Sequence, residues 1–319
     1  MQTITLKNRT ETLEIARFIA GDNAIEQPGR RAIDHACFDR YLAAGGNAFD
    51  TARLYGEGEG ERYLGEYLKN KPRDSFRVIT KCGHHDRGNP PKSRLTRDIL
   101  TAELETSLRL LGLGCVDVLY LHRDDISRPV EEIMPVLADF VKAGKARFLG
   151  ASNWTAGRIA EANAFAEKNS LPGFSVSQIC WSLALTTSAR TGDLSHVIMD
   201  TAEYLWYIEN NFPVMAWTPS ARGYLTKVIA GGPIPPHVAR WYDYLDENTA
   251  RAGRVKSLAE ELNAPAGAVV LAYLMSNPDF PTSAVGSFSA EQQFEEALLA
   301  SALALTQEQR KFLTGGPVL

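Results

Sequence analysis

Three short apolar runs in the first half of the chain each end in an ionisable side chain. Asp50 ends the run NAFD, Lys81 lies at the end of FRVITKC, and His122 ends VDVLYLH. Tyr55 follows Asp50 by five residues. A carboxylate, a phenol, an ammonium and an imidazole that meet at one place can deliver a proton to a carbonyl oxygen and stabilise the charge that develops on it. Singly, each residue could instead be a helix cap or a packed core side chain, so the hypothesis depends on a fold that brings the four together.

The apolar runs recur along the whole chain and alternate with segments of helical periodicity. In residues 97–111, for example, Leu100, Leu104 and Leu108 form one apolar stripe, and Thr96 is suited to cap the helix. Eight such βα units, at about 35 to 40 residues each, favour a (β/α)8 barrel over a doubly wound sheet. The expected strands are residues 13–20, 47–52, 76–82, 116–122, 146–152, 174–179, 213–217 and 282–285.

Length and composition fit a single α/β domain over residues 1–319. The chain is 45% hydrophobic and 23% charged, which is the composition of a globular protein and not of a disordered one. Its formal net charge of −4 argues against nucleic acid as a partner. No run approaches the ~18 apolar residues of a membrane span. Four scattered cysteines without CxxC spacing favour a reducing, cytoplasmic location. One irregular stretch, residues 220–248, contains GGPIPP and predicts a long loop that could act as a lid.

Several longer stretches resemble the aldo-keto reductase family. They span about residues 12–300 in order and read NAFDTARLYG, VITKCG, VDVLYLHRDD, FLGASNW, SQICWS, MAWTPSARGYLT and TSAVGSFSAEQQFEEAL. The resemblance implies a (β/α)8 barrel that binds NADP(H) or NAD(H) at its rim, needs no metal, and reduces an aldehyde or a ketone. By residue matching, it assigns the catalytic tetrad to Asp50, Tyr55, Lys81 and His122.

The resemblance also assigns residues to the cofactor. Ser152, Asn153 and Gln178 take the positions that hold the nicotinamide carboxamide, to which their hydroxyl and amide groups offer donors and acceptors. Trp181 takes the position of the aromatic ring that stacks on the nicotinamide. Without the resemblance, Ser152 and Asn153 could equally cap a helix, and Trp181 could pack in the core. Further cofactor contacts are expected from Trp217, Ser220, Arg222, Gly286, Ser287 and Gln292.

The four tetrad residues divide the chemistry between them. Tyr55 is the candidate proton donor. A cation about 4 Å away stabilises a phenolate by up to about 4 kcal/mol at an effective dielectric constant of 20, but burial opposes ionisation, so we expect a smaller net lowering of the pKa of Tyr55. Lys81 supplies this cation, and Asp50 keeps the lysine charged. His122 needs only one N–H aimed at the carbonyl oxygen to orient it.

Two segments depart from the family pattern. After the first expected strand the sequence reads FIAGDNA, where only Gly21 remains of a glycine-rich turn and the contacts of Asp22 are open. The later segment GSFSAEQQ contains Phe288, and no basic residue lies in 282–293. A 2′-phosphate binds best to a guanidinium or an ammonium group. We therefore expect use of NAD(H) as well as NADP(H), with Arg222 as a cation that could bind the phosphate.

The substrate is expected at the loops that follow the strands. The candidate residues are His84, Arg123 and Trp154, with His85 and Trp217 beside them. Their imidazoles, cation and aromatic faces suit a hydroxylated, sugar-like carbonyl compound. A metal is not expected, because the adjacent His84 and His85 side chains diverge and no third ligand is spaced with them.

Two other functions fit parts of the sequence. In an aldolase or lyase, Lys81 would form a Schiff base, but that function leaves Tyr55 and Asp50 unexplained. In a regulatory module, as in the potassium-channel β-subunits that are similar to this family, the barrel would bind a cofactor with little turnover. The intact tetrad argues against that loss of chemistry. The sequence does not determine the physiological substrate, the direction of the reaction or the oligomeric state.

Overall fold

Eight parallel strands close into a barrel in the order β10-β3-β4-β5-β6-β7-β8-β9. The computed structural model describes residues 1–21, 35–86, 92–288 and 290–316. The single-domain (β/α)8 barrel expected from the sequence is confirmed. The barrel strands are β3 (Phe18–Gly21), β4 (Ala48–Asp50), β5 (Arg77–Cys82), β6 (Val116–Leu121), β7 (Ala146–Ser152), β8 (Phe174–Gln178), β9 (Val214–Trp217) and β10 (Thr282–Gly286).

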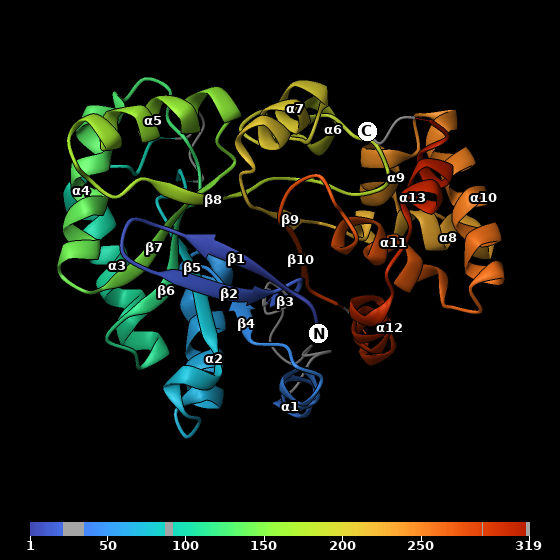
Figure 1. Cartoon of the computed structure of the whole chain (residues 1–319), viewed down its shortest axis with the longest axis horizontal. Coiled ribbons are helices and arrows are strands. Elements are labelled where there is room, and N and C mark those ends of the chain that lie inside the picture. The colour runs from blue at the N-terminus through green and yellow to red at the C-terminus, as the bar shows by residue number, and fades with distance from the viewer. Residues whose placement is uncertain (22–34, 87–91, 289, 317–319) are drawn as a thin grey trace.

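Helices between the strands surround the barrel, and Figure 1 shows α3, α4 and α5 on one side of it and α8, α10 and α13 on the other. Helix α3 shows how the sequence determines where such a helix begins, ends and packs. Thr96 is its N-cap, its leucine stripe is buried, and Gly112 ends it in the left-handed conformation at φ 66°. The α-helices of the described residues are α1 (His35–Ala43), α2 (Glu59–Leu68), α3 (Arg97–Leu111), α4 (Val130–Lys142), α5 (Ala156–Lys168), α6 (Ser188–Thr191), α7 (Thr201–Asn210), α8 (Tyr224–Ala230), α9 (Pro236–Tyr242), α10 (Asp246–Glu261), α11 (Ala266–Met275), α12 (Glu291–Ala302) and α13 (Gln307–Thr314).

An antiparallel hairpin precedes the barrel, and the single barrel strand expected over residues 13–20 is wrong, because that range is divided between a hairpin strand and a barrel strand. Strands β1 (Thr3–Lys7) and β2 (Thr12–Ala16) pair with Ile4 opposite Ile15, and a barrel strand begins only two residues after β2. The buried hairpin side chains pack with residues that fill the barrel interior, such as Val118. The hairpin therefore closes the N-terminal end of the barrel and leaves the opposite end for the site.

Residues 220–248 are mostly helical, so the long loop expected there is wrong. The segment forms a 3-10 turn at Ala221–Gly223, then α8 (Tyr224–Ala230), α9 (Pro236–Tyr242) and the start of α10. Its glycines and prolines mark the ends of helices. Gly231 ends α8 at φ 67°, and Pro236 begins α9, where a missing N–H group costs nothing.

Candidate active site

The catalytic candidates from β4, β5 and β6 meet at the C-terminal end of the barrel. Asp50 is the last residue of β4, and the parallel ladder places β5 beside it, with Lys81 two residues beyond the partner of Asp50. The Lys81 ammonium donates hydrogen bonds to the Asp50 carboxylate and, at 2.9 Å, to the Thr51 carbonyl oxygen. Lys81 and Asp50 are both almost completely buried. This ion pair is therefore fixed by neighbouring strands.

Tyr55 and His122 complete the group. Tyr55 begins a short turn after β4, in which Gly56 and Gly58 adopt positive φ angles of 54° and 98°. This turn brings the Tyr55 ring to 5.0 Å from the Lys81 ammonium and to 5.8 Å from the His122 ring. The structure thus brings together all four side chains that the sequence assigned to the tetrad.

Burial and the neighbouring charges set the protonation of the group. Burial alone would lower the pKa of Lys81, but Asp50 and Tyr55 reverse that effect and raise it. Burial raises the pKa of Tyr55 despite the opposing charge of Lys81, so the net lowering expected from the sequence is wrong. Burial and the charges of Lys81 and Arg123 hold the pKa of His122 well below its usual range. At neutral pH the site therefore contains an ammonium, a protonated phenol and a neutral imidazole.

A cavity of about 430 Å³ opens beside these groups. Two of the three substrate candidates, His84 and Arg123, line it, and so do eight of the ten residues expected to contact the cofactor. The described lining residues are Asp50, Leu54, Tyr55, His84, His122, Arg123, Ser152, Asn153, Gln178, His196, Trp217, Thr218, Pro219, Ser220, Arg222, Trp241, Val285, Gly286 and Ser287.

The amide and hydroxyl groups of β7 and β8 form one wall of this cavity. The Gln178 amide nitrogen donates to the Asp50 carboxylate at 2.9 Å, and the Asn153 amide donates to the Ser152 hydroxyl at 3.1 Å. Asn153 has a positive φ of 56°, a strained conformation that its side chain tolerates better than most. The wall presents hydroxyl and amide groups next to the tetrad, and this donor and acceptor set is complementary to a carboxamide such as that of nicotinamide.

The turn after β9, the strand next to β8 in the barrel, forms a second wall of the cavity. Thr218, Ala221 and Arg222 all have positive φ angles, between 52° and 56°. Such strained backbone persists only where the surrounding structure enforces it, and it clusters at ligand sites. The Arg222 guanidinium lies 4.0 Å from the centre of the Trp241 ring. This turn therefore holds an exposed cation at the edge of the cavity.

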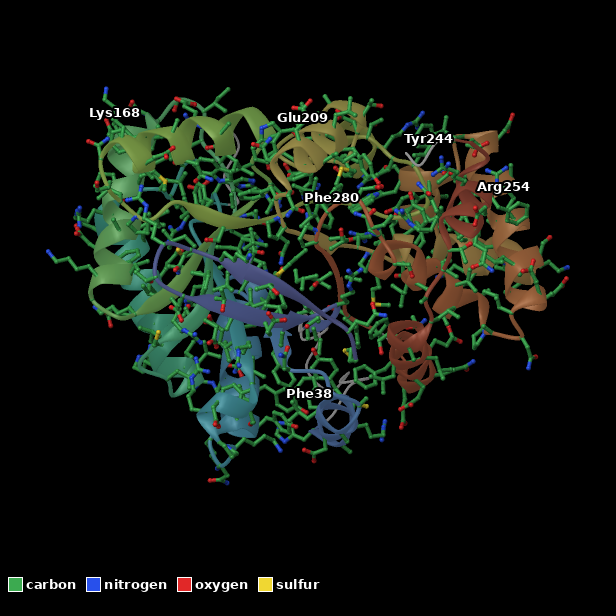
Figure 2. All side chains as sticks on the ribbon, viewed as in Figure 1. Phe38, Lys168, Glu209, Tyr244, Arg254 and Phe280 are labelled. Carbon is green, nitrogen blue, oxygen red and sulfur yellow. The ribbon has the colours of Figure 1, made fainter. Side chains whose placement is uncertain are left out.

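Trp181 does not line the cavity, so the geometry does not support stacking of its ring on a nicotinamide. Strand β8 ends at Gln178, three residues before it, and the indole packs in the core against Tyr204 and Phe280 at ring distances of 5.7 and 5.6 Å. Phe280 is buried, and Figure 2 labels it near the middle of the view. Trp217, at the end of β9, and Trp241 are the indoles that line the cavity among the described residues.

Two further candidates also lie away from the cavity. Trp154 is fully buried under α5, where its ring contacts Phe174 and the Arg158 guanidinium. Gln292 lies on the exposed first turn of α12, where it donates to Glu296 at 3.3 Å. Neither position offers contact with a ligand in this cavity.

Phe288 explains part of the departure from the family pattern. Its ring is buried against Phe18 and Phe294, at 5.9 and 6.1 Å, so it fills the core. Gly21 lies close to the same loop, because a Cβ atom there would approach the Ser287 hydroxyl to 2.8 Å. Asp22 lies outside the described residues.

Sequence reasoning missed His196, Thr218 and Trp241. The His196 ring lies 4.9 Å from the Trp217 ring, and its Nε2 atom lies 2.9 Å from the Arg123 guanidinium. Thr218 directly follows β9 and lies within the quoted stretch MAWTPSARGYLT, so its position carried a signal that was not used. His196 and Trp241 follow no strand directly and match no quoted stretch, so only the three-dimensional fold identifies them.

A second cavity, of about 630 Å³, adjoins the first and shares Leu54, His84 and His122 with it. Lys81 and His85 line this second cavity. Within the described ranges, no group of three His, Cys, Asp or Glu side chains is arranged to hold a metal ion.

Comparisons with known proteins identify the class to which this fold and site belong. The sequence model described as the Aldo/keto reductase family matches residues 23–314, so the chain belongs to that family. Its members are oxidoreductases that act on carbonyl compounds, and the barrel with its polar rim agrees with this class.

Individual relatives are more distant. Aldo-keto reductase AMT2 of Alternaria alternata is 29% identical to this chain, and the match covers 92% of this chain and 83% of the relative. A probable voltage-gated potassium channel subunit beta of Arabidopsis thaliana is 26% identical, and the match covers 92% of this chain and 88% of the relative. A crystal structure of a thermostable aldo-keto reductase with the inhibitor epalrestat superposes with a TM-score of 0.72 at 21% identity, covering 99% of both chains. That likeness supports the fold.

No helix among the residues described here is long and apolar enough to cross a membrane. The cytoplasmic location stays a prediction.

Proposed function

We propose that the protein reduces an aldehyde or a ketone to the alcohol with NADPH or NADH, and that Tyr55 donates the proton. The observation that carries this proposal is the group formed by the buried Lys81–Asp50 pair, Tyr55 and His122 at the edge of the cavity. The wall of Ser152, Asn153 and Gln178, together with Trp217, would hold the nicotinamide. When bound, the reduced nicotinamide supplies a hydride to the carbonyl carbon.

The side chains of this chain would manage the charge on the carbonyl oxygen. The neutral His122 imidazole donates a hydrogen bond that orients the carbonyl group, with the tautomer set by that contact. As negative charge grows on the oxygen, the Tyr55 hydroxyl transfers its proton to it. The Lys81 ammonium stabilises the resulting phenolate, and solvent then returns a proton to Tyr55.

The state of Lys81 argues against a Schiff-base aldolase. A lysine nucleophile must be a neutral amine, and enzymes obtain it by lowering the pKa. Here the pKa of Lys81 is raised because the Asp50 carboxylate offsets the effect of burial. The ammonium is also committed to hydrogen bonds with Asp50 and the Thr51 carbonyl oxygen.

The test is Tyr55→Phe, assayed by oxidation of NADPH and NADH with a panel of small aldehydes, aldoses and keto-sugars. Loss of a general acid predicts a decrease in kcat of about 10²–10⁴-fold, with cofactor affinity nearly unchanged. The matched control is Tyr120→Phe, because the buried Tyr120 hydroxyl has no hydrogen-bond partner among the described residues. Equal activity in wild type and Tyr55→Phe would refute the assigned role.

A second candidate is a cofactor-binding regulatory module, favoured by the similarity to the probable potassium channel subunits. Under this alternative, the cofactor would bind tightly while every carbonyl compound in the panel remained unreduced. The complete tetrad favours turnover. The same assay therefore separates the two functions.

A further inference from the structure

One cation of the catalytic cavity has no part in the proton transfer. Arg123 follows His122, lines the cavity and is only 7% exposed. Its guanidinium donates to the His122 carbonyl oxygen at 3.0 Å and contacts His196 at 2.9 Å. Its Nε–H has no hydrogen-bond partner among the described residues. A guanidinium this deeply buried, at the wall of a ligand cavity, is little screened by solvent and is positioned to attract an anionic group of the ligand.

The nearby carboxylate only partly neutralises this cation. Asp193 approaches the Arg123 guanidinium to 3.4 Å, and the same carboxylate oxygen also faces His196 at 3.4 Å and His85 at 3.9 Å. Its other oxygen accepts hydrogen bonds from the backbone and the hydroxyl of Ser195. Asp193 is 29% exposed on its side chain and does not line the cavity among the described residues. The carboxylate is thus shared among several donors, outside the space that a substrate would occupy.

The remaining charges favour an anion in the cavity. Burial and the charge of Arg123 lower the pKa of both His84 and His196 to about 4, so neither carries a charge at neutral pH. Asp50 is the one carboxylate in the described lining, and Lys81 neutralises it. The positive charge of Arg123 is therefore available near the tetrad, close enough to interact electrostatically with Tyr55.

We propose that Arg123 is a specificity-determining residue that binds a carboxylate or phosphate group carried by the carbonyl substrate. This inference rests on the proposed reduction and names its substrate class as short oxo acids or phosphorylated aldehydes. A guanidinium binds both anions through paired N–H donors. The anion would lie a few bonds from the carbonyl carbon, since Arg123 adjoins the residue that orients the carbonyl group.

The test compares an anionic substrate with its neutral counterpart on the same enzyme sample. The first pair is 3-carboxybenzaldehyde and methyl 3-formylbenzoate, and the second is glyceraldehyde 3-phosphate and glyceraldehyde. In the wild type, kcat/KM should favour the anionic member of at least one pair by about tenfold or more, mainly through KM. The pair with the larger ratio distinguishes carboxylate from phosphate. Because each value is a ratio, it does not depend on the folded fraction of a variant.

Three variants locate the effect. Arg123→Gln should bring the ratio close to one, and Arg123→Lys should retain part of it, because a lysine keeps the charge but loses the paired donors. Arg128→Gln is the matched control, since Arg128 belongs to the same loop, pairs with Glu132 at 2.5 Å and is not among the described lining of either cavity. Its ratio should equal that of the wild type.

Two results would overturn the inference alone: a wild-type ratio near one for both pairs, or a preference that survives in Arg123→Gln. Both leave the reductase function intact, because the neutral aldehydes are still reduced. Absence of turnover with all four substrates would instead overturn the proposed function, and this inference with it.

Discussion

The two halves of the barrel rim are built differently. On the side of β4, β5 and β6, the ionisable groups lie on the strands or one turn beyond them, and the buried Lys81–Asp50 pair links them. On the side of β9 and β10, the cavity is walled by a turn with three positive φ angles at Thr218, Ala221 and Arg222 and by the Trp217 ring. The first half holds buried charges in fixed positions, and the second presents rings and a shaped turn to the cavity.

This difference indicates how substitutions should act. In the first half, a removed charge leaves its partner unpaired in a buried place, so rate and stability should fall together. In the second half, a removed ring or exposed cation should change affinity while the barrel stays intact. Four predictions test that contrast.

The largest effect is expected from Lys81→Met. It removes the cation and leaves Asp50 unpaired, so kcat should fall by at least two orders of magnitude and the free energy of unfolding by about 3–5 kcal/mol. Adding Asp50→Asn should restore part of the stability without restoring the rate. Urea unfolding and steady-state kinetics of the single and double variants measure both quantities. Recovery of activity in the double variant would contradict the roles assigned to the pair.

Two tryptophans separate core packing from ligand contact. Trp181→Ala should lower the free energy of unfolding by about 3–5 kcal/mol with cofactor affinity unchanged, because its ring is buried in the core. Trp217→Leu should weaken cofactor binding by about three- to tenfold, as expected for a lost aromatic contact, with a smaller loss of stability. Thermal unfolding and fluorescence titration of the two variants provide the comparison. The reverse pattern would restore Trp181 as the stacking residue.

Acid should destabilise the rim through its imidazoles. Because burial and Arg123 lower the pKa of His84 and His196 to about 4, the unfolded chain binds more protons than the folded one between pH 6.5 and 4. Their contribution to stability is present above pH 6.5 and is lost as the pH falls through this window. Allowing for partial exposure, each histidine should account for about 1 kcal/mol at pH 4.5. Urea unfolding at pH 7 and pH 4.5 should show a smaller acid loss in His84→Gln/His196→Gln; an equal loss would contradict this assignment.

The smallest effect is expected at Arg222. An exposed guanidinium that binds a 2′-phosphate contributes about 0.2–1 kcal/mol, so Arg222→Gln should weaken NADPH by about two- to fivefold and leave NADH nearly unchanged. Dissociation constants for both cofactors test this. A strong preference for NADPH that survives the substitution would refute the role of Arg222 and the expected tolerance of NADH.

Sequence reasoning identified the residues that regular geometry positions. Asp50, Lys81 and His122 each lie at or next to the end of a parallel strand, and the ends of such strands meet at one rim. The hairpin strand Thr3–Lys7 also carried a signal, since Ile4 and Leu6 alternate with polar residues, as in a half-buried strand.

The sequence could not determine the direction of side chains beyond the strand ends. Trp181 lies three residues past the end of β8, and Trp154 lies two residues past the end of β7. The chain turns at these points, so the side chain can point to either side of the barrel wall. The predicted role of Gln292 depended on where α12 begins, because a shift of one residue along a helix rotates the direction of a side chain by about 100°. His196 is placed by contacts far apart in the chain, which local patterns do not contain.

The most direct test of the central claim is transfer of a label from the cofactor. Two preparations of the reduced cofactor are used, each deuterated at C4 on one face of the nicotinamide ring. We expect one of the two to give an alcohol with a single deuterium on the former carbonyl carbon. Tyr55→Phe should strongly reduce the rate of this transfer. Consumption of the carbonyl compound with no deuterium in the product from either preparation, or a borohydride-trapped adduct on Lys81, would contradict it.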